Sequence, residues 1–136
     1  MSSRDRGPLA DAPMTNRIRQ TANNRLGAVY SALYGFWSAR HAAVTVGRQS
    51  GVGARRDAYS VILFESTTRS ILTNDFTSTP DQLLDAMLAY RSSGGTNFSE
   101  ALRAGGTVME QHWSTERLVS SSSVSLWRLS LMIVSA

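Results

Sequence analysis

The residues best suited to chemistry in this chain are clustered at positions 92–97, where the sequence reads SSGGTN. Adjacent glycines permit backbone conformations closed to other residues, and they let the main chain approach a bound group closely. Gly94, Gly95, Thr96 and Asn97 therefore form a candidate ligand loop. Taken alone, the hexapeptide is better explained as a connection between two helices, with Asn97 as the N-cap of the second.

Other side chains that could do chemistry lack a partner at a useful spacing. His41 and His112 are the only histidines, and no serine, carboxylate or second histidine stands where a catalytic triad or zinc site would need it. Glu65 and Asp85 fall in different predicted elements, so they do not indicate a pair of catalytic acids. The chain has no cysteine, which excludes disulfides, thiolate metal sites and cysteine nucleophiles. No catalytic residue is predicted.

The elements that must position the candidate loop follow from the spacing of apolar residues. Apolar residues recur every three or four positions from Ile18 to Trp37, which predicts an amphipathic helix. Its firmest part is expected from Asn24, a plausible N-cap, to about Arg40. Residues 47–53 are rich in glycine and are predicted to form an exposed loop.

Two strands are predicted after that loop. Residues 57–64 (DAYSVILF) form a short apolar, β-rich run that is typical of a strand buried on both faces. Residues 68–72 alternate in polarity and follow after a short polar connection. This spacing predicts a hairpin whose second strand lies at an edge of the sheet.

Two further helices are predicted on either side of the candidate loop. Thr79 is expected to cap the first, with Pro80 at its first position and Gln82 bonding back to the cap. The second is expected to begin at Asn97, with Glu100 three residues later. The predicted buried faces are Leu83, Leu84, Met87 and Leu88 in the first helix, and Phe98, Ala101, Leu102, Gly105, Val108, Met109 and Trp113 in the second. The order helix, strand, strand, helix, helix predicts an α/β protein in which helices cover a sheet.

Size, composition and charge set the broad class. The chain has 136 residues, 42% of them hydrophobic and 18% charged, which indicates one folded domain. The formal net charge of +4 comes from arginines that are spread along the chain, so no nucleic-acid partner is expected. No apolar run is long enough to cross a bilayer, and no secretory signal is recognisable. We therefore expect no membrane span and a cytoplasmic location.

Three segments resemble the type A domain of von Willebrand factor (vWA) in their order and spacing: DAYSVILF, TPDQLLDAML and GGTNFSEAL. The resemblance implies a partial vWA domain, in which helices pack on a small central sheet in a Rossmann-like, doubly wound α/β fold. Members of that family hold a divalent cation with a D-x-S-x-S motif, a threonine after two glycines, and a later aspartate. The resemblance therefore assigns Thr96 as a metal-site residue, with the kind of hard oxygen ligand that Mg²⁺ prefers.

Two of those three cation-binding loops are missing here, which indicates a vWA domain truncated at both ends. No D-x-S-x-S motif precedes the first helix, and no aspartate loop follows the last. Residues 75–79 (DFTST) imitate the motif but precede the wrong helix, where Thr79 is needed as a cap. Since one hydroxyl compensates little of the cation's charge, Mg²⁺ binding is expected to be weak or absent, with Thr96 a vestigial ligand.

The chain is expected to divide into an irregular N-terminal segment at 1–16, a partial vWA-like domain at 17–119, and a divergent tail at 120–136. The tail is rich in serine and then apolar, and its apolar part could pair as a strand. Without the family's first strand, the central strand at 57–64 would lose a neighbour and leave core residues exposed. Self-association through that exposed core surface is then expected.

The predicted function is non-enzymatic protein–protein binding through an incomplete metal-ion-dependent adhesion site, and the expected partner is another protein. Two alternatives stay open. The chain could be a structural remnant, or truncated gene product, without independent function. It could also be an uncharacterised hydrolase-type enzyme, although no nucleophile–base or carboxylate pair indicates one.

Overall fold

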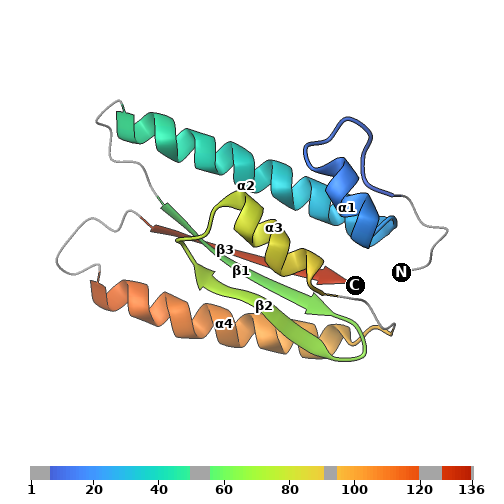
Figure 1. Cartoon of the computed structure of the whole chain (residues 1–136). Helices are drawn as coiled ribbons and strands as arrows, with labels where there is room; N and C mark the ends of the chain where they lie inside the picture. Colours follow the sequence, from blue (N-terminus) through green and yellow to red (C-terminus); the bar gives the residue numbers. More distant parts are fainter. Residues whose placement is uncertain (1–6, 50–55, 91–94, 120–126, 136) are drawn as a thin grey trace.

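A computed structural model describes residues 7–49, 56–90, 95–119 and 127–135, and within them the fold is mixed α/β (Figure 1). The elements in chain order are α1 (Thr15–Thr21), α2 (Arg25–Gln49), β1 (Arg56–Phe64), β2 (Thr68–Asp75), α3 (Pro80–Leu88), α4 (Phe98–Val119) and β3 (Trp127–Ser135). Helices α1, α2 and α3 lie on one side of the sheet and α4 lies on the other, so the sheet is the middle layer (Figure 1).

The sheet has the strand order β2-β1-β3, which places β1 at its centre. Strands β1 and β2 form the predicted antiparallel hairpin, with β2 at an edge. The expectation that β1 is buried on both faces is confirmed, because every side chain from residue 57 to residue 64 is buried. Strand β2 is longer than predicted and reaches Asp75.

The tail contributes the third strand. β3 runs parallel to β1 in unbroken register, from Arg56 opposite Trp127 to Phe64 opposite Ser135. The expectation that the central strand lacks a neighbour is therefore wrong. The run WRLSLMIVS is apolar enough to pair, and α4 supplies the crossover that two parallel strands need.

Alternate residues of β1 face different helical layers. Tyr59, Val61 and Leu63 belong to the core cluster that also contains Trp37 of α2. On the other face, the rings of Phe64 and Phe98 are 5.8 Å apart in an edge-on arrangement. Burial of apolar surface on both faces of β1 is the main stabilising term for such a layered fold.

Close contact between α4 and β3 depends on a glycine. A Cβ atom placed on Gly105 would lie 2.8 Å from Cδ1 of Ile133 and 3.4 Å from Cδ2 of Leu131. A methyl group at this position would therefore displace the end of the Ile133 side chain, and a larger side chain would push the helix away from the strand.

The first helical region differs from its prediction at two points. The chain breaks between α1 and α2, and Asn24 caps α2 as predicted, since its Oδ1 accepts a hydrogen bond from the backbone N–H of Gly27 at 3.2 Å. Helix α2 then runs nine residues beyond Arg40, so the prediction of a loop starting at residue 47 is wrong for residues 47–49. A single glycine in a helix costs only about 1 kcal/mol relative to alanine, so Gly47 does not end the helix.

The caps of the later helices are confirmed, but part of the predicted apolar face is not. Thr79 and Gln82 form a reciprocal capping box at the start of α3, with Pro80 in the first turn. Leu83, Leu84 and Met87 of α3 are buried, as are Ala101 and Val108 of α4. The prediction is wrong for the two apolar residues at the start of α4 that are more than half exposed, Phe98 and Leu102.

Candidate functional site

The predicted ligand loop lies at the carboxyl end of the central strand. The backbone N–H of Asn97 donates a hydrogen bond to the carbonyl oxygen of Glu65, just beyond β1, at 2.5 Å. Gly95 has a φ of 97°, and a Cβ there would lie 3.0 Å from Cβ of Ser66. Glycine is needed at this position because of both the left-handed backbone and the close approach. Gly94 lies outside the described residues.

Asn97 is committed to capping α4. Its Oδ1 accepts a hydrogen bond from the backbone N–H of Glu100 at 3.1 Å, and its Nδ2 donates to Oε2 of Glu100 at 2.9 Å. The hydroxyl of Thr68 on β2 donates to Oε1 of the same glutamate at 3.0 Å. These bonds fix the start of α4 against the hairpin, and among the described loop residues 95–97 they leave the exposed Thr96 as the available hydroxyl side chain.

The residues around Thr96 do not fit a Mg²⁺ site. Glu100 is occupied by Asn97 and Thr68. The second nearby carboxylate, Glu65, is also engaged, because it forms a hydrogen bond with the hydroxyl of Tyr90. Burial, and then this hydrogen bond, raise the pKa of Tyr90. Among the described residues no three acidic or histidine side chains come close enough to share a metal ion. Mg²⁺ gives up its waters reluctantly and is usually bound through one or two carboxylates, whereas Thr96 contributes one neutral hydroxyl.

An apolar surface adjoins the loop. Phe98 is 58% exposed and Leu102, one turn further along α4, is 53% exposed. The Phe98 ring is held in place by its edge-on contact with the buried Phe64. We call Gly95, Thr96, Phe98 and Leu102 the loop surface. It combines two large apolar side chains with an exposed hydroxyl, at the end of a buried strand.

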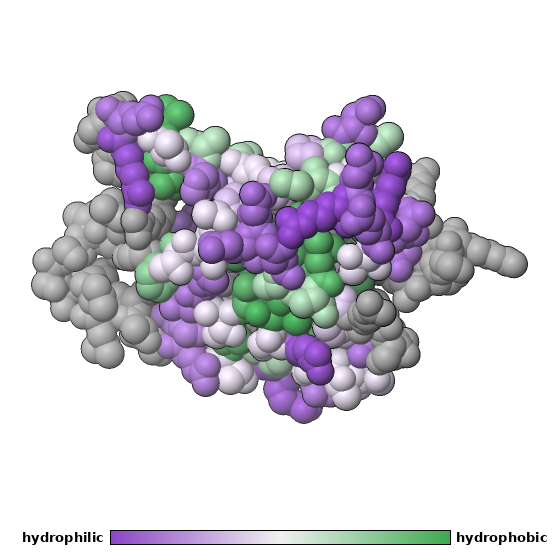
Figure 2. Space-filling model, in the orientation of Figure 1, coloured by the Kyte–Doolittle hydropathy of each residue, from purple (hydrophilic) through white to green (hydrophobic). Residues whose placement is uncertain are grey.

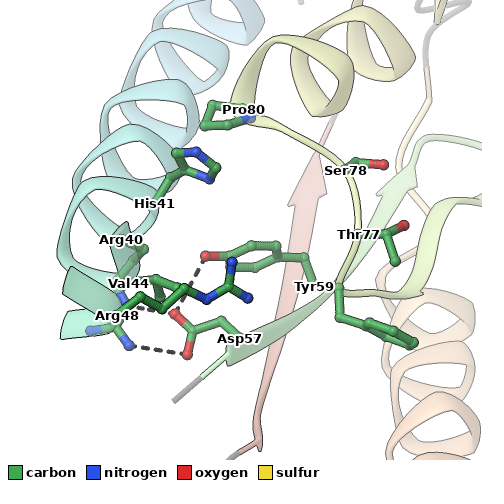
Figure 3. Close-up of a pocket in the computed structure, with 10 residues that line it drawn as sticks. Arg40, His41, Val44, Arg48, Asp57, Tyr59, Thr77, Ser78 and Pro80 are labelled. Carbon is green, nitrogen blue, oxygen red and sulfur yellow. Dashed lines mark hydrogen bonds and ion pairs between the residues drawn. The ribbon is translucent and has the colours of Figure 1, made fainter. Parts of the chain in front are cut away.

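A second feature, which the sequence analysis did not identify, is a cavity of about 350 Å³ at the opposite, amino end of β1. Asp57 and Tyr59 of β1 lie at its base, and Arg40, His41 and Arg48 of α2 form one wall (Figure 3). The connection between β2 and α3 closes the other side with a mixed set of residues, namely Phe76, Thr77, Ser78 and Pro80. Figure 2 shows that hydrophilic residues dominate the face of the molecule seen there, around a central apolar patch.

An ion pair anchors the base of this cavity. Nε of Arg40 lies 2.5 Å from Oδ2 of Asp57, and Nη2 lies 3.1 Å from Oδ1, which is a two-pronged contact. The hydroxyl of Tyr59 donates to the same carboxylate at 3.4 Å. Burial and the negative charge of Asp57 raise the pKa of Tyr59 to about 12, so its hydroxyl keeps its proton at neutral pH. The hydrogen bond to Asp57 raises the pKa of Arg40 further, although burial opposes it.

The sequence carried a partial signal for the cavity. Arg40, Val44 and Arg48 are spaced four apart, which puts them on one face of a helix once α2 is known to extend that far. His41, interpreted from the sequence as a surface or capping residue, is exposed at the cavity wall. Asp57 is a carboxylate at the start of an apolar strand, and such a residue needs a partner when it is buried.

Comparisons of the chain with protein families, with curated proteins and with solved structures found no match. The assignment to the vWA family therefore stays a proposal. None of the described helices is long and apolar enough to cross a membrane.

Proposed function

We propose that this chain is a non-enzymatic protein-binding domain of partial, doubly wound vWA type that contacts its partner through the loop surface. The observation that supports this most directly is the exposure of Phe98 and Leu102 beside the exposed Thr96. Residues with 58% and 53% of their surface in water, on a helix whose start is rigidly capped, are more typical of a contact surface than of a folding core.

The chemistry of the loop surface suits a protein partner. Burying a phenylalanine or leucine side chain stabilises a complex by about 1.5–3 kcal/mol, which is the size of an interface anchor. The contact of Phe98 with Phe64 and the cap at Asn97 hold the surface in place before binding. A preformed surface loses less conformational entropy when a partner binds. A second copy of the chain is one such partner. Such self-association would use the loop surface, because the core surface expected to cause it is covered by the pairing of β3 with β1.

The proposal assigns no role to a metal ion or to catalysis. Thr96 is a vestigial ligand in this view, and binding proceeds without Mg²⁺. Nucleic acid is not the proposed partner, and the location proposed is cytoplasmic. The alternative of a structural remnant predicts a chain that does not unfold cooperatively, so a melting curve by circular dichroism separates it from the binding domain.

The binding proposal is tested by capturing proteins on the immobilised chain and on a Phe98→Ser/Leu102→Ser double variant. The control is Val46→Ser, which removes a 63% exposed apolar residue from α2, on the other side of the sheet. We expect the double variant to lose the captured partner and the control to retain it. Equal capture by all three proteins would refute the assignment of binding to the loop surface.

A further inference from the structure

The cavity at the amino end of β1 has an excess of positive charge. The two arginines Arg40 and Arg48 line it from α2, together with His41, whereas Asp57 is the only carboxylate among the described residues that line it. Asp57 is already paired with Arg40. Within the described chain the Arg48 side chain has no hydrogen-bond or ion-pair partner, and Figure 3 shows its guanidinium and the His41 ring on the cavity side of the helix. The Arg48 guanidinium is therefore available to bind an anionic ligand in the cavity.

The Arg40 guanidinium can donate hydrogen bonds to a second acceptor besides Asp57. A guanidinium has five N–H donors, and Asp57 accepts from two of its nitrogen atoms. The Asp57 side chain is only 2% exposed, so this contact fixes the plane of the guanidinium against the base of the cavity. The donors that remain keep a fixed direction, and a ligand that accepts from them loses little arginine side-chain entropy.

The opposite wall limits where an anionic group would sit. The backbone N–H groups of Thr77 and Ser78, ahead of α3, already donate to Oδ1 of Asp75 at 3.1 and 2.9 Å. The cap of α3 at Thr79 is satisfied by Gln82. These donors are therefore occupied, and the attraction for an anion lies on the α2 side.

Part of the lining is apolar. Val44 of α2, Phe76 after β2 and Pro80 at the start of α3 border the cavity. Its volume of about 350 Å³ lies at the lower end of the range of small-molecule sites, roughly 300–1,000 Å³. The space suits a compact ligand with one polar and one apolar end.

From this arrangement we propose that the cavity binds a small organic oxyanion, a carboxylate or phosphate ester carrying a ring-sized apolar group. The oxyanion is held by Arg48, His41 and the free edge of Arg40, and the apolar group lies toward Phe76 and Pro80. This site is distinct from the loop surface at the other end of β1, so the inference does not rest on the proposed function.

The experiment titrates the chain with phenyl phosphate, benzoate and inorganic phosphate by isothermal calorimetry at low ionic strength. Arg48→Gln removes a charged donor and should weaken binding of the preferred aryl anion by about tenfold. The matched control is Arg103→Gln, since Arg103 is an exposed arginine of α4 on the far side of the sheet. Melting temperatures of both variants should stay close to that of the unaltered chain, because both side chains are exposed.

Each outcome bears on the proposal. Saturable binding of phenyl phosphate or of benzoate, weakened by Arg48→Gln and not by Arg103→Gln, supports it and identifies the preferred oxyanion. No saturable binding of either aryl compound overturns it. Equal weakening by the two variants shows unspecific attraction to a basic protein and overturns it too. Binding of inorganic phosphate as tight as that of phenyl phosphate shows that the apolar wall takes no part, which refutes the ligand class.

Discussion

The ion pair between Arg40 and Asp57 predicts that its two partners are unequally important for stability. The Asp57 side chain is 2% exposed and that of Arg40 is 32% exposed. Arg40→Met leaves a carboxylate buried without a counter-ion. Asp57→Asn leaves an arginine that is already at the surface and can turn toward water. The first change should therefore cost much more stability than the second.

The magnitudes follow from what each variant leaves behind. Removing one partner of a buried pair costs about 3–5 kcal/mol, and we expect the lower end, about 3 kcal/mol, for Arg40→Met because Tyr59 still donates to Asp57. Asp57→Asn should cost about 1 kcal/mol, since the amide keeps a hydrogen-bonding oxygen. The double variant Arg40→Met/Asp57→Leu replaces both charges by apolar groups and should recover most of the loss.

Urea denaturation followed by circular dichroism measures these differences, provided that the slope of the transition stays the same in all variants. The four proteins to compare are the unaltered chain, the two single variants and the double variant. Equal losses from Arg40→Met and Asp57→Asn would show that burial of the carboxylate is not the deciding factor. A double variant no more stable than Arg40→Met would refute the reasoning in the same way.

Three other predictions concern separate parts of the fold. Burial would raise the pKa of Asp75, but hydrogen bonds from the following turn outweigh it and hold that pKa below its usual value. Asp75→Ala should therefore cost about 1 kcal/mol at pH 7, and the difference in melting temperature between variant and unaltered chain should vanish as pH falls through that lowered pKa. Gly105→Ala should leave the stability nearly unchanged, because the higher helix propensity of alanine offsets its contact with the movable end of the Ile133 side chain. Gly105→Val should lower the stability by about 2 kcal/mol, as measured by calorimetric melting. Thr96→Ala should change the stability by less than about 0.5 kcal/mol, and titration with Mg²⁺ should show no tight site with or without it; tight binding by the unaltered chain would contradict this.

Local signals in the sequence were sufficient for several elements. The start of α3 is specified by Thr79, Pro80 and Gln82, which interact with one another within a single turn. Residues 57–64 were predicted to be a buried strand because an apolar run of that length fits few other structures. The capping contacts of α3 join residues that are close in sequence, and the prediction of the strand depends only on its burial. Neither prediction needs knowledge of the tertiary fold.

Contacts between residues far apart in the chain could not be predicted from the sequence. The apolar end of the tail was recognisable as a possible strand, but its neighbour β1 was not, because strand pairing depends on the arrangement of the whole sheet. The end of α2 was missed for a different reason: residues 41–49 have little apolar periodicity, so no pattern indicated that the helix continues past Arg40.

Some features of the candidate site could be predicted from the sequence and others could not. The position of the Asn97 loop between two helices followed from the order of the elements, but the exposure of Phe98 and Leu102 did not. The spacing of apolar residues identifies the apolar face of α4. Which residues of that face are buried depends on where the sheet lies, and here they include Ala101 and Val108. The cavity at Asp57 brings together residues from three elements, and no spacing along the chain records that.

The parallel pairing of β1 with β3 also has a consequence for how the chain folds during synthesis. The β1–β2 hairpin can form as soon as residues 56–75 have left the ribosome, but its other edge must wait for β3, which is made after α4. During that interval β1 presents an apolar strand with one row of unpaired backbone groups, which is a template for pairing with other chains. Contacts between residues so far apart also close slowly. Translation that stalls between α4 and β3 should therefore leave a nascent chain that depends on chaperones to stay soluble.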